Sequence, residues 1–208
     1  DKMSWEGVYS HAGHTYSARS KEEIRSIAKK ALSEFNKVSL YEKSMYWGDT
    51  PSCSVLNDFG GADVLTAGNL VFYDVMQVNI GSCTYDDIAV VMACPVVGKS
   101  QERNELLIHG GAVHFSKEML TDADGTMQFG KLAKIAKHGW KDVMPGCYLK
   151  SISQEHGLVH ASDDFIQKTQ IGDLVYIYPA HSCLTADLMK GYLTTEGKFR
   201  SDNSAFMK

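Results

Sequence analysis

The sequence predicts an α/β fold in its first part and a mostly antiparallel β-domain in the remainder. Residues 1–80 alternate strand-like and helix-like segments, an order that is typical of a parallel α/β sheet or barrel. From about residue 85 the pattern changes to short runs rich in valine, isoleucine, leucine and tyrosine, separated by turns. The chain has 208 residues, of which 44% are hydrophobic, so it can bury a substantial core. We therefore expect two domains, residues 1–80 and residues 81–208.

The best-defined element of the first domain is a helix that follows Ser20. Ser20 and Glu23 fit a capping box, in which the serine side chain satisfies a backbone N–H of the first helical turn. Apolar residues then recur at helical spacing, namely Ile24, Ile27, Ala28, Ala31, Leu32 and Phe35. Before this helix, the apolar-polar run Ser4–Ser10 ends in a glycine-containing turn. This order predicts a strand-like run, a loop and then a helix.

A second alternating series follows. Leu40–Trp47 is expected to form a strand, which the loop Gly48–Ser52 closes. A helix of one to two turns is expected around Ser54–Asp58, followed by the strand Asp63–Thr66 and the loop Gly68-Asn69. Strand, loop, helix and strand in this order indicate a parallel sheet or barrel.

The second domain contains four strand-like runs, which are Ile88–Val97, Glu105–His109, Cys147–Ile152 and Asp173–Tyr178. Turns separate them, and only a weak helical stretch near Gly130–His138 interrupts the pattern. We expect these runs to pair in a small, mostly antiparallel sheet.

Composition excludes several classes of protein. The net charge is −4 and the 21 basic residues are scattered, which argues against a nucleic-acid partner. No apolar run approaches the roughly 18–20 residues that span a bilayer, so we expect no membrane segment. The five cysteines are odd in number, widely spaced and without a CxxC pair. They predict a reducing, cytoplasmic compartment. The charge instead favours a small-molecule or protein partner.

Three loops carry polar groups near predicted strand ends. The loop Gly48–Ser52 (GDTPS) is expected to open a helix, whose N-terminus suits a phosphate, although a capped turn explains the same residues. In Ala67–Asp74 (AGNLVFYD) the Tyr73 hydroxyl can donate to phosphate, or its ring can pack. Tyr9–Tyr16 (YSHAGHTY) is either an active-site loop or a polar surface turn. Each of these alternatives stays open.

His181 and Cys183 lie two residues apart in the stretch YPAHSCLTAD. On a strand they would point to the same face, and Pro179 upstream would stop a helix from running through. Zinc accepts imidazole and thiolate, and two protein ligands with open positions suit a catalytic Lewis acid. A buried cysteine beside a satisfied histidine is the more frequent alternative. A cysteine–histidine nucleophile is disfavoured, because parallel side chains on one strand do not converge on a substrate.

Together, six segments resemble the D-serine dehydratase and D-threonine aldolase family. They are GVYSHAGHTYSARS, GDTPSCS, LTAGNLVFYDVMQ, ELLIHGGAVHFSKE, SQEHG and YPAHSCLTADL, and they occur in the family's order over nearly the whole chain. In that family a pyridoxal-phosphate barrel of the alanine racemase type precedes a β-domain with a metal site. The resemblance therefore implies a partial TIM-type α/β barrel, formed by its last βα units, followed by the β-domain.

The resemblance also implies roles for individual residues. Tyr9 matches a catalytic tyrosine close to cofactor and substrate, whereas His181 and Cys183 match the zinc ligands of the dehydratase branch. Aldolases of the family tend to carry an aspartate in place of the cysteine. The residues implied to bind the phosphate of pyridoxal 5'-phosphate are Gly48, Asp49, Thr50, Gly68, Asn69 and Tyr73.

The activity implied by the resemblance is dehydration of a β-hydroxy D-amino acid such as D-serine. Elimination of water gives a keto acid and ammonia, with Zn²⁺ acting as a Lewis acid on the leaving hydroxyl. One alternative is a D-threonine-type aldolase, which forms glycine and an aldehyde. The other is a non-catalytic fragment that binds a metal or a phosphate.

The sequence departs from the family pattern at three places. The cofactor lysine and an arginine near the pyridine nitrogen belong upstream of the segment YSHAGHTY, and Lys2, Lys29 and Lys117 do not match that lysine. His109 stands where an aspartate is more usual. We therefore expect the carboxyl-terminal part of a larger enzyme, whose partners are the missing amino-terminal barrel segment or chain and a second copy in a homodimer.

Overall fold

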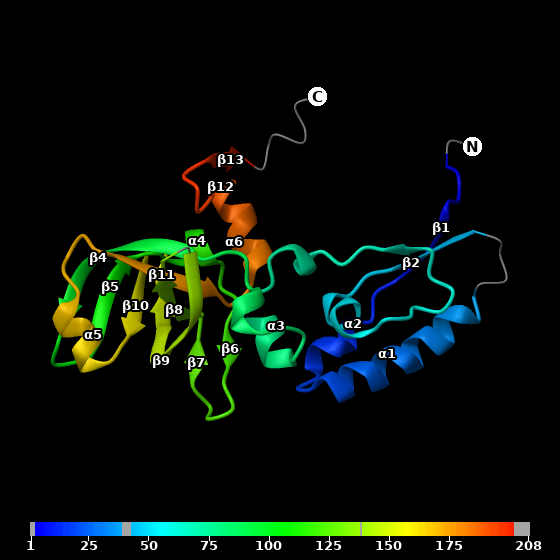
Figure 1. The fold of residues 1–208 in the computed structure, drawn as a ribbon, viewed down its shortest axis with the longest axis horizontal. Coiled ribbons are helices and arrows are strands. Elements are labelled where there is room, and N and C mark those ends of the chain that lie inside the picture. The colour runs from blue at the N-terminus through cyan, green and yellow to red at the C-terminus, as the bar shows by residue number, and fades with distance from the viewer. Residues whose placement is uncertain (1–2, 39–42, 138, 202–208) are drawn as a thin grey trace. The chain divides into compact units, whose positions relative to one another are not determined.

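The structure, a computed structural model, describes residues 3–38, 43–137 and 139–201 (Figure 1). Contacts divide the chain into two compact units. The first unit comprises Asp1–Tyr73 with Gln77–Thr84, and the second comprises Asp74–Met76 with Tyr85–Lys208. Because the units interleave between residues 74 and 84, the expected boundary between residues 80 and 81 stays a prediction. No helix of the described residues is long and apolar enough to cross a membrane.

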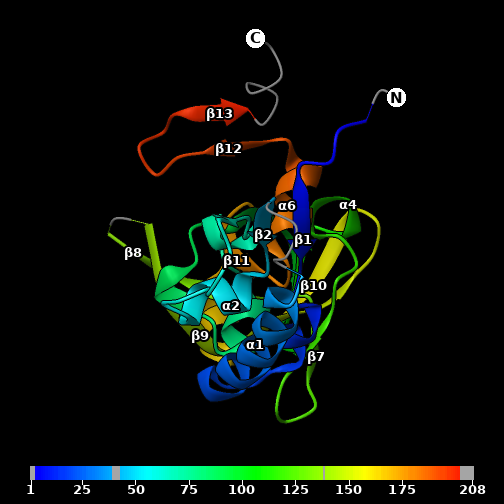
Figure 2. The ribbon, with the colours of Figure 1, turned by 90° about the vertical axis from the view of Figure 1, so that its right-hand side faces the viewer.

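The first unit contains a parallel sheet with strand order β1-β2-β3. The strands are β1 (Gly7–Ser10), β2 (Ser44–Trp47) and β3 (Val64–Leu65). The α-helices are α1 (Lys21–Asn36), α2 (Thr50–Val55) and α3 (Val75–Ile80), and the short 3₁₀ helices are η1 (Gly13–Ser17) and η3 (Asn69–Val71). The first two residues of α3 belong to the second unit. Helices α1 and α2 lie side by side in Figures 1 and 2. This arrangement is α/β, and the curvature of a TIM-type barrel stays a prediction.

Helix α1 forms as its sequence predicts. The Ser20 side chain accepts a hydrogen bond from the Glu23 N–H at 3.2 Å, which confirms Ser20 as the N-cap. The Glu23 carboxylate accepts a hydrogen bond from the backbone N–H of Arg19 at 2.7 Å. In a capping box it would instead accept from the N–H of the N-cap residue, Ser20. The apolar face is buried at Ile24, Ala28, Leu32 and Phe35. The Phe35 ring meets the ring of Trp47 edge-on, with centroids 5.6 Å apart.

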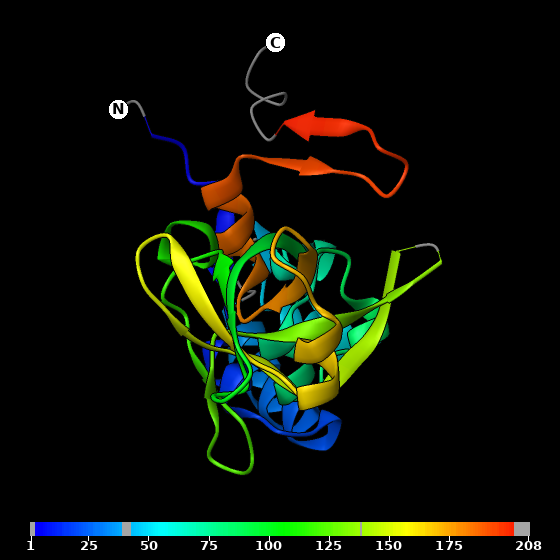
Figure 3. The same ribbon diagram turned by 90° about the vertical axis from the view of Figure 1, so that its left-hand side faces the viewer.

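The second unit is built around a closed antiparallel barrel with strand order β10-β5-β4-β11-β8-β9 (Figure 3). Its strands are β4 (Met92–Ser100), β5 (Glu105–His109), β8 (Gly130–Ala136), β9 (Gly139–Ile152), β10 (His156–His160) and β11 (Leu174–Pro179). Buried aliphatic side chains from all six strands fill the interior, among them Val96, Ile108, Leu132, Leu149, Val159 and Ile177. The antiparallel β-domain expected from the sequence is therefore confirmed.

Short elements surround this barrel. They are η4 (Tyr85–Asp87), α4 (Ala112–Phe115), β6 (Leu120–Thr121), β7 (Met127–Gln128), α5 (Asp163–Lys168), α6 (Ser182–Met189), β12 (Gly191–Leu193) and β13 (Phe199–Ser201). Strands β12 and β13 pair only with each other among the described residues, and β6 pairs with β7.

Several expected elements differ from the structure. The weak helix predicted at Gly130–His138 is wrong, because residues Gly130–Ala136 form β8 between β9 and β11; His138 lies outside the described residues. Gly130 lies so close to β11 that a Cβ there would be 2.5 Å from the Tyr178 carbonyl oxygen. Pairing with distant strands determines the secondary structure of this segment, and the local spacing of apolar residues does not reveal such pairing.

The predicted boundaries in the first unit shift for local reasons. The helix expected at Ser54–Asp58 is α2, which begins at Thr50 because the preceding residue caps it. The strand expected at Leu40–Trp47 is described only from residue 43 onward, and β2 begins at Ser44. The strand expected at Asp63–Thr66 is reduced to Val64–Leu65.

Candidate functional site

The predicted cofactor residues of the first unit gather at the carboxyl ends of its parallel strands. Tyr9 lies on β1 opposite Tyr46 of β2, and its hydroxyl donates to the Gly48 carbonyl oxygen at 3.2 Å. The same hydroxyl lies 3.4 Å from Nδ1 of His11, and the Tyr9 side chain remains exposed. The carboxyl edge of a parallel sheet is where α/β proteins bind ligands. Tyr9 thus lies beside the GDTPS loop, and its role near a cofactor stays a prediction.

The GDTPS loop forms a capped turn at the start of α2. One carboxylate oxygen of Asp49, Oδ2, accepts the Ser52 N–H at 2.8 Å and the Thr15 hydroxyl at 2.9 Å. Asp49, Thr50 and Ser52 are all buried. The Asp49 carboxylate therefore already binds one of the backbone N–H groups that a phosphate would use. A contact between Asp49 and a cofactor stays a prediction.

Two buried oxygen atoms of this loop lack a hydrogen-bond partner among the described residues. They are Oδ1 of Asp49 and Oγ of Ser52. Buried polar atoms are normally paired, so these two positions fit an additional polar ligand or an ordered water.

The second predicted loop adjoins the first through Tyr73, whose hydroxyl lies 3.0 Å from the Ser54 hydroxyl of α2. Gly68 has an ordinary φ of −74°, and a Cβ built on it would meet no heavy atom within 4 Å in the part of the chain that the structure describes. Neither backbone strain nor packing requires glycine there, so the open space suits a group that approaches the backbone. Asn69 is buried beside it. The two loops together fit a phosphate.

His181 and Cys183 do not lie on a strand, so the same-face arrangement considered for a strand does not apply. Strand β11 ends at Pro179, His181 is the N-cap of α6 with a φ of −135°, and Cys183 is in the first turn of that helix. The proline only ends the strand. The helix starts at Ser182, three positions after the proline, so the proline does not prevent the helix. The imidazole and the thiol therefore flank a helix N-terminus.

His181 is held by an aspartate that sequence reasoning did not select. Its Nδ1 lies 3.0 Å from Oδ2 of Asp74, and Asp74 is completely buried. Because an ionised carboxylate only accepts hydrogen bonds, Nδ1 carries the proton. The pKa of His181 lies above its ordinary value, mainly because of this bond, against an opposing effect of burial. The charges of Asp74 and Glu118 raise this pKa further.

The Cys183 thiol has a pKa above its ordinary value. Burial is the main cause, and the negative charge of Asp74 adds to it; the hydrogen bonds of Ser182 and of the Cys183 backbone act in the opposite direction. A thiol with a raised pKa is protonated at neutral pH, so a metal must displace the proton to bind sulfur. This arrangement fits a zinc ligand better than an activated nucleophile.

The sequence predicts a metal site with two protein ligands, His181 and Cys183, and this site stays a prediction. Within the described ranges, no group of three or more histidine, cysteine, aspartate or glutamate side chains is placed to hold a metal ion. The imidazole and thiol are donors that zinc accepts, and they leave further positions to water or substrate. Asp74 could have been found only from its place at the end of AGNLVFYD, because 107 residues separate it from its partner.

Three other histidines of the resembling segments, His109, His114 and His156, form a separate group. His109 and His156 are directly opposite on β5 and β10, with ring centroids 5.7 Å apart. His114 of α4 meets His109 edge-on at 4.9 Å, and its Nδ1 accepts the Gly111 N–H at 3.1 Å. The imidazole that replaces the family's usual aspartate therefore lies in a cluster of three rings.

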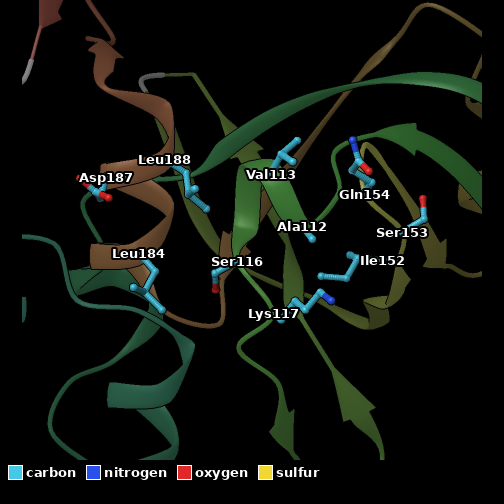
Figure 4. Close-up of a pocket in the computed structure, with 10 residues that line it drawn as sticks. All are labelled: Ala112, Val113, Ser116, Lys117, Ile152, Ser153, Gln154, Leu184, Asp187 and Leu188. Carbon is cyan, nitrogen blue, oxygen red and sulfur yellow. The ribbon is translucent and has the colours of Figure 1, made fainter.

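A cavity of about 630 Å³ lies between α4 and α6 (Figure 4). Aliphatic side chains of both helices face it, including those of Val113, Leu184 and Leu188. Helix α6 buries its small and polar residues, Ser182, Thr185 and Ala186, against the unit. Its leucines are consequently about 41% exposed. None of the predicted site residues lines this cavity.

Comparison with known proteins gives a family match over half of the chain. The family model described as "Putative serine dehydratase domain" matches residues 89–195. A D-serine dehydratase of Dictyostelium discoideum is 29% identical over 206 residues, which cover 91% of this chain and 50% of that protein. A D-threo-3-hydroxyaspartate dehydratase of Delftia sp. is 26% identical over 198 residues, with coverage of 89% and 51%. The chain thus spans about half the length of the curated relatives it matches.

Solved structures show the same fold. An alanine-racemase-like protein of Idiomarina loihiensis has a TM-score of 0.78 at 26% identity, over 94% of this chain and 54% of that one. A cysteine-to-alanine mutant of the Delftia dehydratase, described as the metal-free form, has a TM-score of 0.81 at 24% identity, with coverage of 96% and 55%. The chain therefore has the fold of part of an alanine-racemase-like protein.

Proposed function

Because the chain belongs to the serine dehydratase domain family, we propose that it forms part of a D-amino-acid dehydratase. The reaction is β-elimination of water from a β-hydroxy D-amino acid, with D-serine as the model substrate, which gives a keto acid and ammonia. The family match and the dehydratase relatives support the reaction class. The cysteine at position 183 favours dehydration over the aldolase alternative, because the aldolases that the sequence resembles carry an aspartate there.

The His181–Asp74 pair carries this proposal. A ring nitrogen bonded to a buried carboxylate is typical of histidines that bind metals through their other nitrogen. Cys183 follows two residues later with a thiol that a soft metal can deprotonate. A solved D-threo-3-hydroxyaspartate dehydratase is described as a cysteine-to-alanine mutant in the metal-free form, and this description supports the proposal of a metal. We propose Zn²⁺, which when bound acts as a Lewis acid toward the leaving hydroxyl.

Pyridoxal 5'-phosphate is the second proposed group. When bound, it withdraws electrons from the substrate's α-carbon and so acidifies the α-proton. Gly68 and Asn69 would hold its phosphate on one side, and Thr50 would contact it from the start of α2. The Tyr73–Ser54 hydrogen bond keeps these two loops together. Gly48 and Asp49 shape the loop, since Asp49 caps the helix and the Gly48 carbonyl accepts the Tyr9 hydroxyl.

Tyr9 is the proposed catalytic residue of this chain. Its exposed hydroxyl lies at the carboxyl edge of the sheet and can hold or pass a proton to His11, 3.4 Å away. The lysine that carries the cofactor would come from the proposed upstream barrel segment, within a cytoplasmic homodimer.

The assay that tests this proposal compares products from two substrates. The complete protein, loaded with cofactor and zinc, is incubated with D-serine or D-threonine. We expect pyruvate and ammonia from D-serine. Acetaldehyde and glycine from D-threonine, without keto acid from either substrate, would establish the aldolase alternative. Absence of cofactor absorbance from the complete protein would support the non-catalytic alternative.

A further inference from the structure

One oxygen atom of Asp74 contacts the segment that carries both predicted metal ligands. Oδ2 accepts the His181 Nδ1–H at 3.0 Å and the Ser182 N–H at 2.9 Å, and the Ser182 hydroxyl lies 3.4 Å away. We propose that Asp74 is a positioning residue that orients His181 and Cys183 together for metal binding. This inference rests on the proposed zinc site and assigns a role to a residue that contacts neither metal nor substrate.

The position of Asp74 is fixed by its surroundings. The residue is completely buried, although a carboxylate is normally exposed unless it is paired. Two residues later, the Met76 N–H donates to the Ala180 carbonyl oxygen at 3.2 Å. The segments 74–76 and 180–182 are therefore joined by backbone and side-chain hydrogen bonds, and the carboxylate cannot move without breaking them.

The contact with His181 determines which ring nitrogen binds a metal. A carboxylate that accepts the Nδ1–H selects one tautomer, in which the lone pair available for a metal is on Nε2. It also fixes the rotation of the ring, because Nδ1 must face the buried oxygen. Without Asp74, the ring can adopt either tautomer and several orientations, so fewer molecules are ready to bind zinc.

The contact with Ser182 orients the second ligand. His181 occupies the N-cap of α6 but makes no side-chain capping bond, so the cap comes from Asp74 in another segment. A carboxylate at a helix N-terminus also interacts favourably with the helix dipole. Cys183 lies in this first turn. The orientation of its side chain therefore depends on the same Asp74 oxygen that holds the His181 imidazole.

The test uses Asp74→Asn and Asp74→Ala in the complete protein. Nitrogen NMR of the metal-free protein reports the His181 tautomer, and a competing chelator measures zinc affinity. We expect Asp74→Ala to populate both tautomers and to weaken zinc binding about 10- to 100-fold. Asp74→Asn retains an oxygen that accepts both N–H groups, so we expect the wild-type tautomer with a smaller loss of affinity.

The control is Asp63→Asn, which removes the charge from a carboxylate that accepts the Met45 N–H at 2.8 Å in the first unit. It should leave zinc affinity and the His181 tautomer unchanged.

If Asp74→Ala fails to fold, Asp74→Asn still reports both quantities. The proposal is wrong if Asp74→Ala keeps the wild-type tautomer and zinc affinity, or if neither Asp74 variant loses more zinc affinity than the control. If zinc binding survives His181→Ala, the proposed metal site is wrong. The tautomer of His181, measured in the metal-free protein, still tests the role of Asp74 in that case.

Discussion

At the scale of single residues, His181 and Cys183 bind and release protons differently from an ordinary histidine and cysteine. The pKa of each lies above its usual value, because of the Asp74 hydrogen bond for the imidazole and because of burial for the thiol. A metal that binds Cys183 would therefore have to displace the thiol proton, and the sulfur would then be a negatively charged ligand.

Removing the thiol should remove the metal. Cys183→Ala is expected to lose most of the bound zinc and most of the dehydratase activity while retaining pyridoxal phosphate, because the predicted phosphate contacts lie in other segments. Metal analysis, pyruvate formation and cofactor absorbance measure the three effects. Cys83→Ala, at another partly buried cysteine, is the matched control. Survival of both zinc and activity in Cys183→Ala would show that the metal assignment is wrong.

His114 predicts an acid sensitivity of the second unit. Burial is the main cause that holds its pKa below the ordinary value, and the charge of His109 adds to it. When the pH falls below about 6.5, the unfolded chain binds a proton at this residue that the folded chain does not, so stability decreases. The decrease continues until the pH reaches the lower pKa of the folded state.

Urea unfolding at pH 7.5, 6.5 and 5.5 measures this effect. His114→Gln should lose less stability over this interval than the wild type, because glutamine does not titrate. His14→Gln, in the first unit, is the control. Equal acid dependence of His114→Gln and the wild type would contradict the assignment.

At the scale of elements, α1 and β5 are predictable because their signals are local. A serine cap and apolar residues three to four positions apart suffice for α1, and a compact aliphatic run bounded by polar residues suffices for β5, whose bounds Glu105–His109 match the prediction. Strand β8 is not predictable in this way. Its segment contains helix-like spacing, and its structure follows from pairing with β9 and β11.

The start of α6 shows the same limit at the candidate site. Pro179 before His181 favours an end to regular structure, and it does end β11. The helix begins three residues later with a cap from Asp74, which is 108 residues away from Ser182. The spacing of His181 and Cys183 alone leaves both interpretations open, and only the family resemblance implies a metal site. The contact of Asp74 with His181 and Ser182 is found only in the three-dimensional structure.

The cap of α1 gives a prediction about stability. Ser20→Ala removes the acceptor of the Glu23 N–H and should lower the free energy of unfolding by about 1 kcal/mol. Ser20→Asp replaces that acceptor and should retain most of the stability. Urea unfolding followed by circular dichroism compares the variants. A Ser20→Ala protein as stable as the wild type would mean that the cap contributes nothing measurable.

At the scale of the whole molecule, the first unit has two open sheet edges among the described residues, at β1 and β3. Parallel strands are normally covered on both faces, and unpaired edges promote association. Val64 and Leu65 of β3 are 39% and 49% exposed. Trp5, before β1, is 52% exposed. We therefore propose that the upstream barrel segment, or a chain that supplies it, covers these strands.

Light scattering after size-exclusion chromatography tests this association. Residues 1–208 alone should self-associate or aggregate, whereas co-expression with the segment that precedes them should give a defined complex. A folded, monodisperse monomer of 23.0 kDa would contradict the proposed partner.

The central claim is that zinc held by His181 and Cys183 is required for the elimination of water. The most direct test follows zinc content and pyruvate formation from D-serine while a chelator removes the metal from the complete protein. We predict that both decrease in proportion and that added Zn²⁺ restores both. Pyruvate formation that continues at its original rate after the zinc has been removed would contradict the account.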